Sequence, residues 1–221
     1  MSISQDRSKT LKLYDWNGVG IDIDEFWRLL EEKESELFHN YRVLGKTDVA
    51  LKQEYKPAVM AKMREWEGSG ELVYPAIPGF QDRIDADLNE GYRIGIFTSM
   101  DMDDLERQAN GAGLSLKEFI ILNLSEAIKE GNLPEKISKE SPEVFAQTRL
   151  SFQSRDIRRI VTYVDDAEER IMAAASANAV NNNAPQFESL YHFSPKFNIA
   201  EEQKDGFYRI NDISRVVEKP L

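Results

Sequence analysis

Several oxygen-bearing side chains follow short apolar runs of the sequence, at the point where each run ends. They are Asp15, Thr98, Asp165 and Asp166. Carboxylate oxygens with no histidine or cysteine nearby are the ligands that Mg²⁺ prefers. A carboxylate can also attack phosphorus and form an aspartyl phosphate. These residue types predict magnesium binding and phosphoryl chemistry at one site, provided that the fold brings them together.

A hydroxyl group and an ammonium group complete the set of candidate residues. Thr98, with the adjacent hydroxyl of Ser99, and Lys139 can bind phosphoryl oxygens as charge shifts in the transition state. Taken one at a time, all of these residues also fit ordinary helix caps and solvated side chains, and Lys136 competes with Lys139 for the role of the lysine. Their joint order along the chain is what favours a site.

Alternating strand-like and helix-like segments must position these side chains. Strands are predicted at residues 11–14, 92–97, 119–124 and 159–164, with edge strands near 190–193 and 207–210. Segments with apolar residues at helical spacing lie between them. The alternation implies βαβ units and a mainly parallel sheet. In such a sheet the carboxyl ends of neighbouring strands form one rim, where a site is expected.

A polar and acidic segment between the first two strands predicts a separate helical insertion. Two helices are expected, the first capped by Asp24 and the second running from about Asp48 to Glu67. Pro57 is a candidate point for a kink or a break in the second helix. We therefore expect a core made of residues 1–20 and 75–221 and an insertion of residues 21–74.

Composition narrows the class of function. The chain has 221 residues, no cysteine and a formal net charge of −11. The absence of cysteine excludes disulfides and thiolate ligands and fits a reducing compartment, and the N-terminal residues show no apolar targeting segment. An acidic surface repels nucleic acid and anionic lipid, so neither is an expected partner. The sequence predicts a cytoplasmic protein and does not indicate its oligomeric state.

Four motifs in order resemble those of the haloacid dehalogenase-like (HAD) hydrolase superfamily. They are Asp15-Trp16-Asn17-Gly18, the strand YRIGIFTS with Thr98, Lys139 in KESPEVF, and TYVDDAEERIMAA with Asp165 and Asp166. The match in order and spacing extends over residues 10–180. It implies a Rossmann-like α/β core, with helices on both faces of a mainly parallel sheet, and a small α-helical cap inserted between the first two motifs.

The resemblance also implies residue roles and a cofactor. Asp15 is expected to be the nucleophile and a ligand of Mg²⁺, while Asp165 binds the metal directly and Asp166 binds it directly or through water. The residue at position 17 normally serves as general acid and base, and its backbone carbonyl binds the metal. Thr98 and Lys139 are the expected phosphate ligands.

Asn17 departs from the pattern of the superfamily. An amide can neither protonate a leaving oxygen nor deprotonate water at neutral pH, whereas a carbonyl ligand is unaffected. The chain is then a slow or inactive relative that binds ligands, an enzyme for cleavage of carbon–phosphorus or carbon–halogen bonds, or a variant made to trap a complex. The sequence leaves these alternatives open.

The leading hypothesis is a Mg²⁺-dependent phosphatase that acts on a small phosphorylated metabolite through an aspartyl phosphate. Asp15, Thr98 and Lys139 carry the chemistry, with Asn17 as the weakened acid/base position. The alternatives are a catalytically inactive ligand-binding or regulatory protein and a phosphonatase-like or dehalogenase-like reaction on the same scaffold. The identity of the substrate cannot be read from the sequence, because residues of the cap would set it.

Overall fold

The structure is a computed structural model that describes residues 6–130, 133, 139–153, 155–179 and 184–217. The described chain divides into two compact units. One unit comprises residues Asp22–Pro75, and the other comprises the segments on either side of it. Lys136, the predicted competitor of Lys139, lies outside the described residues.

The larger unit is built on a seven-stranded sheet with the order β3-β2-β1-β4-β5-β7-β6. The strands are β1 (Thr10–Asp15), β2 (Arg93–Thr98), β3 (Phe119–Asn123), β4 (Arg159–Asp165), β5 (Leu190–Phe193), β6 (Glu201–Lys204) and β7 (Phe207–Ile210). All neighbouring pairs are parallel except β6 with β7. The prediction of a mainly parallel α/β sheet is confirmed.

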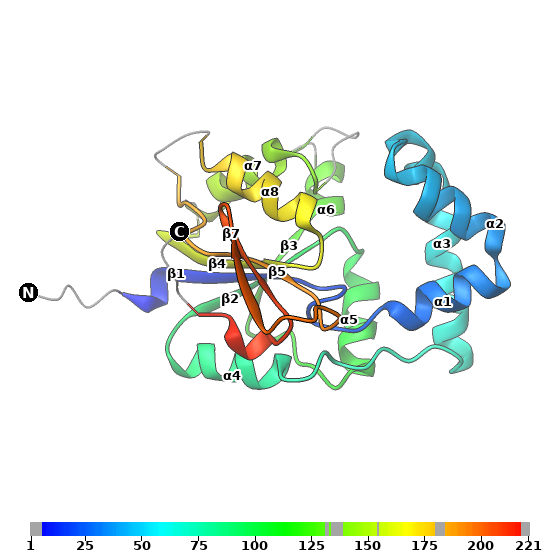
Figure 1. Cartoon of the computed structure of the whole chain (residues 1–221), viewed down its shortest axis with the longest axis horizontal. Coiled ribbons are helices and arrows are strands. Elements are labelled where there is room, and N and C mark those ends of the chain that lie inside the picture. The colour runs from blue at the N-terminus through cyan, green and yellow to red at the C-terminus, as the bar shows by residue number, and fades with distance from the viewer. Residues whose placement is uncertain (1–5, 131–132, 134–138, 154, 180–183, 218–221) are drawn as a thin grey trace, which may run out of the picture. The chain divides into compact units, whose positions relative to one another are not determined.

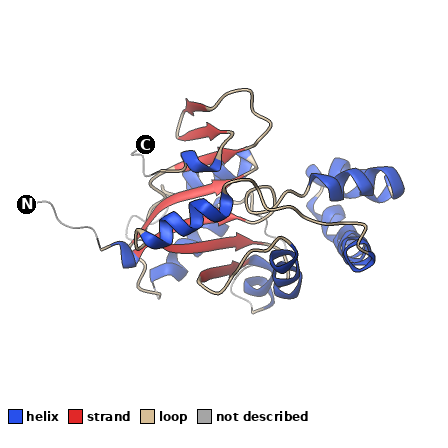
Figure 2. Cartoon of the chain, turned by 90° about the horizontal axis from the view of Figure 1, so that it is seen from below, coloured by secondary structure: helices blue, strands red, loops and turns tan. Residues whose placement is uncertain are grey.

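Helices cover both faces of this sheet. They are α4 (Phe80–Asn89), α5 (Met102–Gly111), α6 (Leu124–Lys129), α7 (Pro142–Gln153) and α8 (Glu168–Ala177). In Figure 1 the sheet lies between α4 on one side and α7 with α8 on the other, and Figure 2 views it from the side of α4. This is the Rossmann-like arrangement that alternating strands and helices predict.

The alternation of side chains along β1 explains how one strand serves both faces. Leu11 and Leu13 belong to the apolar core that includes Phe145 of α7 and Ile171 of α8. Lys12 and Tyr14 point to the opposite face, where Tyr14 packs edge-on against Phe80 of α4. Every residue of β1 is buried, so the strand has no solvent face, and the polar groups of Lys12 and Tyr14 need partners inside the protein.

Asp87 of α4 provides these partners. Its carboxylate accepts a hydrogen bond from Lys12 Nζ at 2.5 Å and from the Tyr14 hydroxyl at 2.8 Å. It also forms an ion pair with Arg83, one helical turn earlier. Lys12 and Asp87 are 3% and 0% exposed, so the ion pair is almost completely removed from water. These contacts connect α4 to β1.

Asp87→Ala is expected to lower the free energy of unfolding by about 3–5 kcal/mol, because it leaves the ammonium of Lys12 buried without its carboxylate. Urea denaturation measures this loss. Asp85→Ala is the matched control on the same helix, since Asp85 is exposed and its side chain accepts a hydrogen bond from Gln81, one helical turn away. The control is expected to change the stability by less than about 0.5 kcal/mol. Equal losses in the two variants would contradict the role assigned to Asp87.

The smaller unit is helical. It contains α1 (Asp24–Lys33), α2 (Ser35–Phe38) and α3 (Val49–Ser69), with a π-helical turn at His39–Val43. Phe26 of α1 and Trp66 of α3 are both buried, and their ring centroids are 6.0 Å apart. The apolar stripes of the two long helices therefore form a small core of their own.

Two details of this unit differ from the sequence-based expectations. Asp24 does not cap α1 but is its first residue, and the carboxylate of Asp22 accepts a hydrogen bond from the Asp24 backbone N–H at 2.9 Å. α3 runs without a break through Pro57. The second helix begins close to Asp48, as predicted, and the Asp48 side chain caps it by accepting a hydrogen bond from Leu51 N–H.

The prediction that residues 190–193 and 207–210 form edge strands is wrong in one respect. Both segments are strands, but each has a neighbour on either side, and the edge strand at this end of the sheet is β6. The sequence EEQK of β6 carries three charges and is largely exposed. Charged residues are typical of an edge strand, because they discourage pairing with another chain, but they also give no apolar signal by which to predict one.

Candidate metal and nucleophile site

Three of the predicted site residues are placed by adjacent parallel strands. β1 lies between β2 and β4 and is parallel to both. Asp15, Thr98 and Asp165 are the last residues of these three strands. Because the strands run in the same direction, their carboxyl ends meet at one rim of the sheet.

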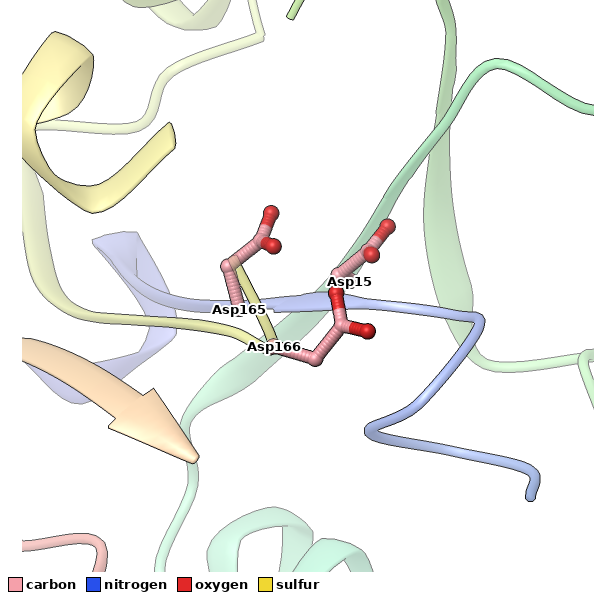
Figure 3. A group of neighbouring side chains, drawn as sticks. All are labelled: Asp15, Asp165 and Asp166. Carbon is pink, nitrogen blue, oxygen red and sulfur yellow. The ribbon is translucent and has the colours of Figure 1, made fainter. Parts of the chain in front are cut away.

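Three carboxylates gather at this rim, as Figure 3 shows. Asp15, Asp165 and Asp166 each offer an oxygen atom, and these three oxygens all lie within 4.8 Å of one another. Asp15 and Asp165 are buried, whereas the side chain of Asp166 is 39% exposed. An oxygen-only set of three carboxylates fits a hard divalent cation such as Mg²⁺ or Mn²⁺.

Gly18 allows the turn after Asp15 to pass directly against Asp166. Its φ angle is +84°, which an L-residue with a side chain rarely adopts. A Cβ atom at this position would lie 2.4 Å from Oδ2 of Asp166. The turn that carries Asn17 can therefore approach the carboxylates only because residue 18 has no side chain.

Lys139 joins the carboxylates from the segment before α7. Its Nζ donates to Asp15 Oδ1 at 2.5 Å and to the backbone oxygen of Phe97 at 2.9 Å, and it lies 3.5 Å from Asp165 Oδ2. The side chain is only 5% exposed. Lys139 thus fixes one oxygen of the predicted nucleophile and connects the ends of β1 and β2.

Arg170 also belongs to the site, and the sequence analysis missed it. Its Nη1 lies 3.1 Å from Asp15 Oδ2, 3.2 Å from Asp165 Oδ1 and 3.5 Å from Asp166 Oδ1. A single nitrogen therefore contacts all three carboxylates. The spacing of four residues between Asp166 and Arg170 is that of one helical turn, so an ion pair at the start of α8 was a signal available in the sequence.

Three further residues, which the sequence analysis did not assign to the site, form hydrogen bonds with Asp165 or Asp166. The Tyr163 hydroxyl donates to Asp165 Oδ2, and both side chains lie on the same face of β4 because they are two residues apart. The backbone N–H of Ala167 donates to Asp165 Oδ1 at 3.0 Å. His192 of β5 places a ring nitrogen 3.2 Å from the backbone oxygen of Asp166.

The remaining predicted residues of the site are Thr98, Ser99 and Asn17. The Thr98 hydroxyl is buried and accepts a hydrogen bond from the Met100 backbone N–H at 3.1 Å. Ser99 is exposed. Oδ1 of Asn17 is buried and has no hydrogen-bond partner among the described residues, so it is an acceptor atom that a ligand can satisfy.

The balance of charge at the site explains the pKa shifts of its acids. Burial and the neighbouring charges of Asp165 and Asp15 raise the pKa of Asp166. Burial acts on Asp165 in the same direction, but Arg170 and Lys139 outweigh it and hold the pKa of Asp165 below its ordinary value. Two cations thus face three carboxylates, and the third carboxylate lacks a counter-charge of its own.

No protein-family model matches the sequence, and no curated protein matches it. Solved structures do resemble it. A dehalogenase with an intermediate complex is 13% identical, with a TM-score of 0.59 over 95% of both chains. CbbY from Rhodobacter sphaeroides, in complex with phosphate, is 15% identical, with a TM-score of 0.58 over 94% of this chain and 95% of the other. The L-2-haloacid dehalogenase from Xanthobacter autotrophicus is 11% identical, with a TM-score of 0.54 over 90% of this chain and 80% of the dehalogenase.

These likenesses show that the chain has the haloacid dehalogenase-like fold. The resemblance inferred from the four motifs is therefore confirmed at the level of the fold. The roles of the individual residues stay predictions. Within the part of the chain that the structure describes, no helix is both long enough and apolar enough to span a bilayer.

Proposed function

We propose that the chain is a Mg²⁺-dependent hydrolase that acts on a small phosphorylated metabolite through an aspartyl phosphate at Asp15. The observation that carries this proposal is the setting of Asp15. Its carboxylate is buried at the end of β1, accepts a hydrogen bond from Lys139 at 2.5 Å, and lies beside two further carboxylates. A buried acid in such a cluster is a candidate for chemistry.

The proposed reaction has two steps. An oxygen of Asp15 forms a bond to phosphorus while the bond from phosphorus to the leaving oxygen breaks. Water then attacks phosphorus, the Asp15 carboxylate is restored, and phosphate is released. The leaving oxygen takes up one proton and the attacking water gives one up. Both protons are exchanged with solvent, because the amide of Asn17 can neither donate nor accept them at neutral pH.

Residues of the site would hold the metal and the phosphoryl group. Asp15, Asp165 and Asp166 are the proposed metal ligands, with the backbone carbonyl of Asn17. When bound, the divalent cation supplies positive charge that offsets the charge of the phosphoryl oxygens. Lys139 keeps Asp15 oriented, since it bonds to the carboxylate and to the backbone of β2 at the same time.

Thr98 and Ser99, at the end of β2, are the proposed ligands for the phosphoryl oxygens, together with Lys139. The helical unit Asp22–Pro75 is the proposed cap, which excludes water and selects the substrate. A cytoplasmic location is part of the same proposal, since the chain has no cysteine.

Asn17 favours a second candidate, which is displacement of halide from carbon. An Asp15 oxygen would bond to carbon while the carbon–halogen bond breaks, and water would then hydrolyse the resulting ester. Halide leaves with its electron pair and needs no proton. The absence of an acid at position 17 therefore does not slow the first step of this reaction. Dehalogenases are among the solved structures with this fold.

A substrate panel separates these reactions. Phosphate release is measured from a set of phosphate monoesters with Mg²⁺ and with EDTA, and halide release is measured from 2-haloacids. We expect Mg²⁺-dependent release of phosphate. Halide release without phosphate release would replace the first proposal by the second. Binding of Mg²⁺ with no turnover of either kind would indicate a ligand-binding protein and contradict both.

A further inference from the structure

Arg170 occupies the centre of the carboxylate cluster. Nη1 of this residue is within 3.5 Å of one oxygen from each of Asp15, Asp165 and Asp166. These are the same carboxylates that the proposed function assigns to the metal. Lys139, the other cation described at this site, contacts Asp15 and Asp165.

A metal ion and the guanidinium cannot share this position. Mg²⁺ binds carboxylate oxygens at about 2.0–2.1 Å and draws them together around itself. Nη1 already contacts one oxygen of each carboxylate, so an ion bound to these oxygens would face the guanidinium at short range. Two positive charges would then lie close together beside the buried carboxylates of Asp15 and Asp165, where their repulsion is less screened than in water. Binding of the metal therefore requires Arg170 to move.

The surroundings of Arg170 allow such a movement. The residue lies in the first turn of α8, and its side chain is 24% exposed, so it has a path to solvent. Glu140 offers an alternative carboxylate on that path, with Oε1 at 3.6 Å from Arg170 Nε. That Nε has no hydrogen-bond partner among the residues that the structure describes. A displaced guanidinium could thus keep an ion pair with Glu140.

We propose that Arg170 is a built-in cation that competes with the divalent metal for Asp15, Asp165 and Asp166 and thereby sets the affinity of the site for the metal. The inference rests on the proposed function, because it takes the same carboxylates as metal ligands. In the metal-free protein Arg170 holds the three acids together. Binding of the metal replaces the contacts of this guanidinium by contacts of the ion. The loss of the Arg170 ion pairs therefore lowers the net affinity of the site for the metal.

Titration calorimetry with Mn²⁺ tests the competition without any assay of activity. Arg170→Gln keeps a long polar side chain but removes the charge, and we expect it to bind Mn²⁺ at least tenfold more tightly than the unmodified protein. Arg158→Gln is the control. Arg158 is 71% exposed and pairs with Asp156 outside the site, so the variant removes the same charge and should change the affinity less than twofold.

A second variant covers the case in which Arg170→Gln does not fold. Arg170→Lys keeps the positive charge on a side chain without the planar fork of the guanidinium, and it is expected to bind Mn²⁺ with intermediate affinity. Thermal unfolding gives a further measurement. Without metal, Arg170→Gln should melt below the unmodified protein, and saturating Mn²⁺ should raise its melting temperature by more.

The outcomes separate this inference from the proposed function. Equal Mn²⁺ affinity in the unmodified protein and Arg170→Gln, or weaker binding by the variant, would overturn the competition and leave the metal-dependent hydrolase intact. Absence of binding in both proteins would overturn the competition together with the proposed metal dependence. Tighter binding by Arg158→Gln to the same extent would show a general effect of net charge and would also overturn the role of Arg170.

Discussion

Replacement of Asp15 by asparagine is expected to reduce turnover by about 10⁴-fold or more, whichever substrate class the protein accepts. The amide has no negative charge and is a poor nucleophile, so the first bond to phosphorus or carbon does not form. The change in shape is minimal, and the hydrogen bond from Lys139 Nζ can still be accepted by the amide oxygen. Steady-state release of phosphate or halide measures the effect.

The matched control for this variant is Asp156→Asn. Asp156 is 65% exposed, pairs with Lys9 and Arg158, and has a positive φ of 56°, a conformation that asparagine tolerates well. The control is expected to retain full activity. Trapping of a labelled phosphoenzyme adds a direct readout, because label should be found in the unmodified protein and not in Asp15→Asn. Label in the variant would show that the nucleophile is another residue.

The carboxyl ends of the strands explain why much of the site was predictable. A buried run that ends on a carboxylate is a local pattern, and parallel pairing of neighbouring strands then brings the ends together. The sequence therefore predicts that Asp15 and Asp165 meet, and the structure places their oxygens in one cluster. Lys139 was identified by its place before a helix, and it does reach Asp15.

Arg170, Tyr163 and the buried Lys12–Asp87 pair were not predicted, for a common physical reason. From the sequence alone, a charged or polar residue in a strand or in the first turn of a helix is predicted to be exposed to solvent unless its partner is known. Asp87 lies 75 residues from Lys12 along the chain, and Arg170 lies 155 residues from Asp15. Only the packing of α4 and α8 against the sheet shows that these side chains are inside the protein.

The order of the last strands was unpredictable for a different reason. β5, β6 and β7 are four residues each, and their patterns do not specify which neighbour each strand pairs with. β7 inserts between β5 and β6, so the strand order at this end does not follow the sequence. Short strands carry little register information, and tertiary packing decides among the alternatives. The site is unaffected, because it uses β1, β2 and β4.

Asn17→Asp is expected to raise the turnover of phosphate monoesters by about 10²–10⁴-fold, which is the usual contribution of a general acid and base. Oδ1 of Asn17 is buried and has no hydrogen-bond partner among the described residues. A carboxylic acid at this position of the motif is expected to protonate the leaving oxygen and then to deprotonate the attacking water. Release of phosphate with Mg²⁺ present measures the gain, and Asn17→Ala controls for mere loss of the amide.

The same substitution also distinguishes the two candidate reactions. Departure of halide needs no proton, so Asn17→Asp should leave the first step of dehalogenation unaccelerated, and the added negative charge should hinder the approach of an anionic haloacid. A gain on phosphate monoesters alone therefore assigns the scaffold to phosphoryl transfer, with Asn17 as the residue that limits its rate. If Asn17→Asp and Asn17→Ala behave alike on every phosphate monoester, position 17 does not act as an acid or base in this protein, and the absence of an acid there cannot explain slow turnover.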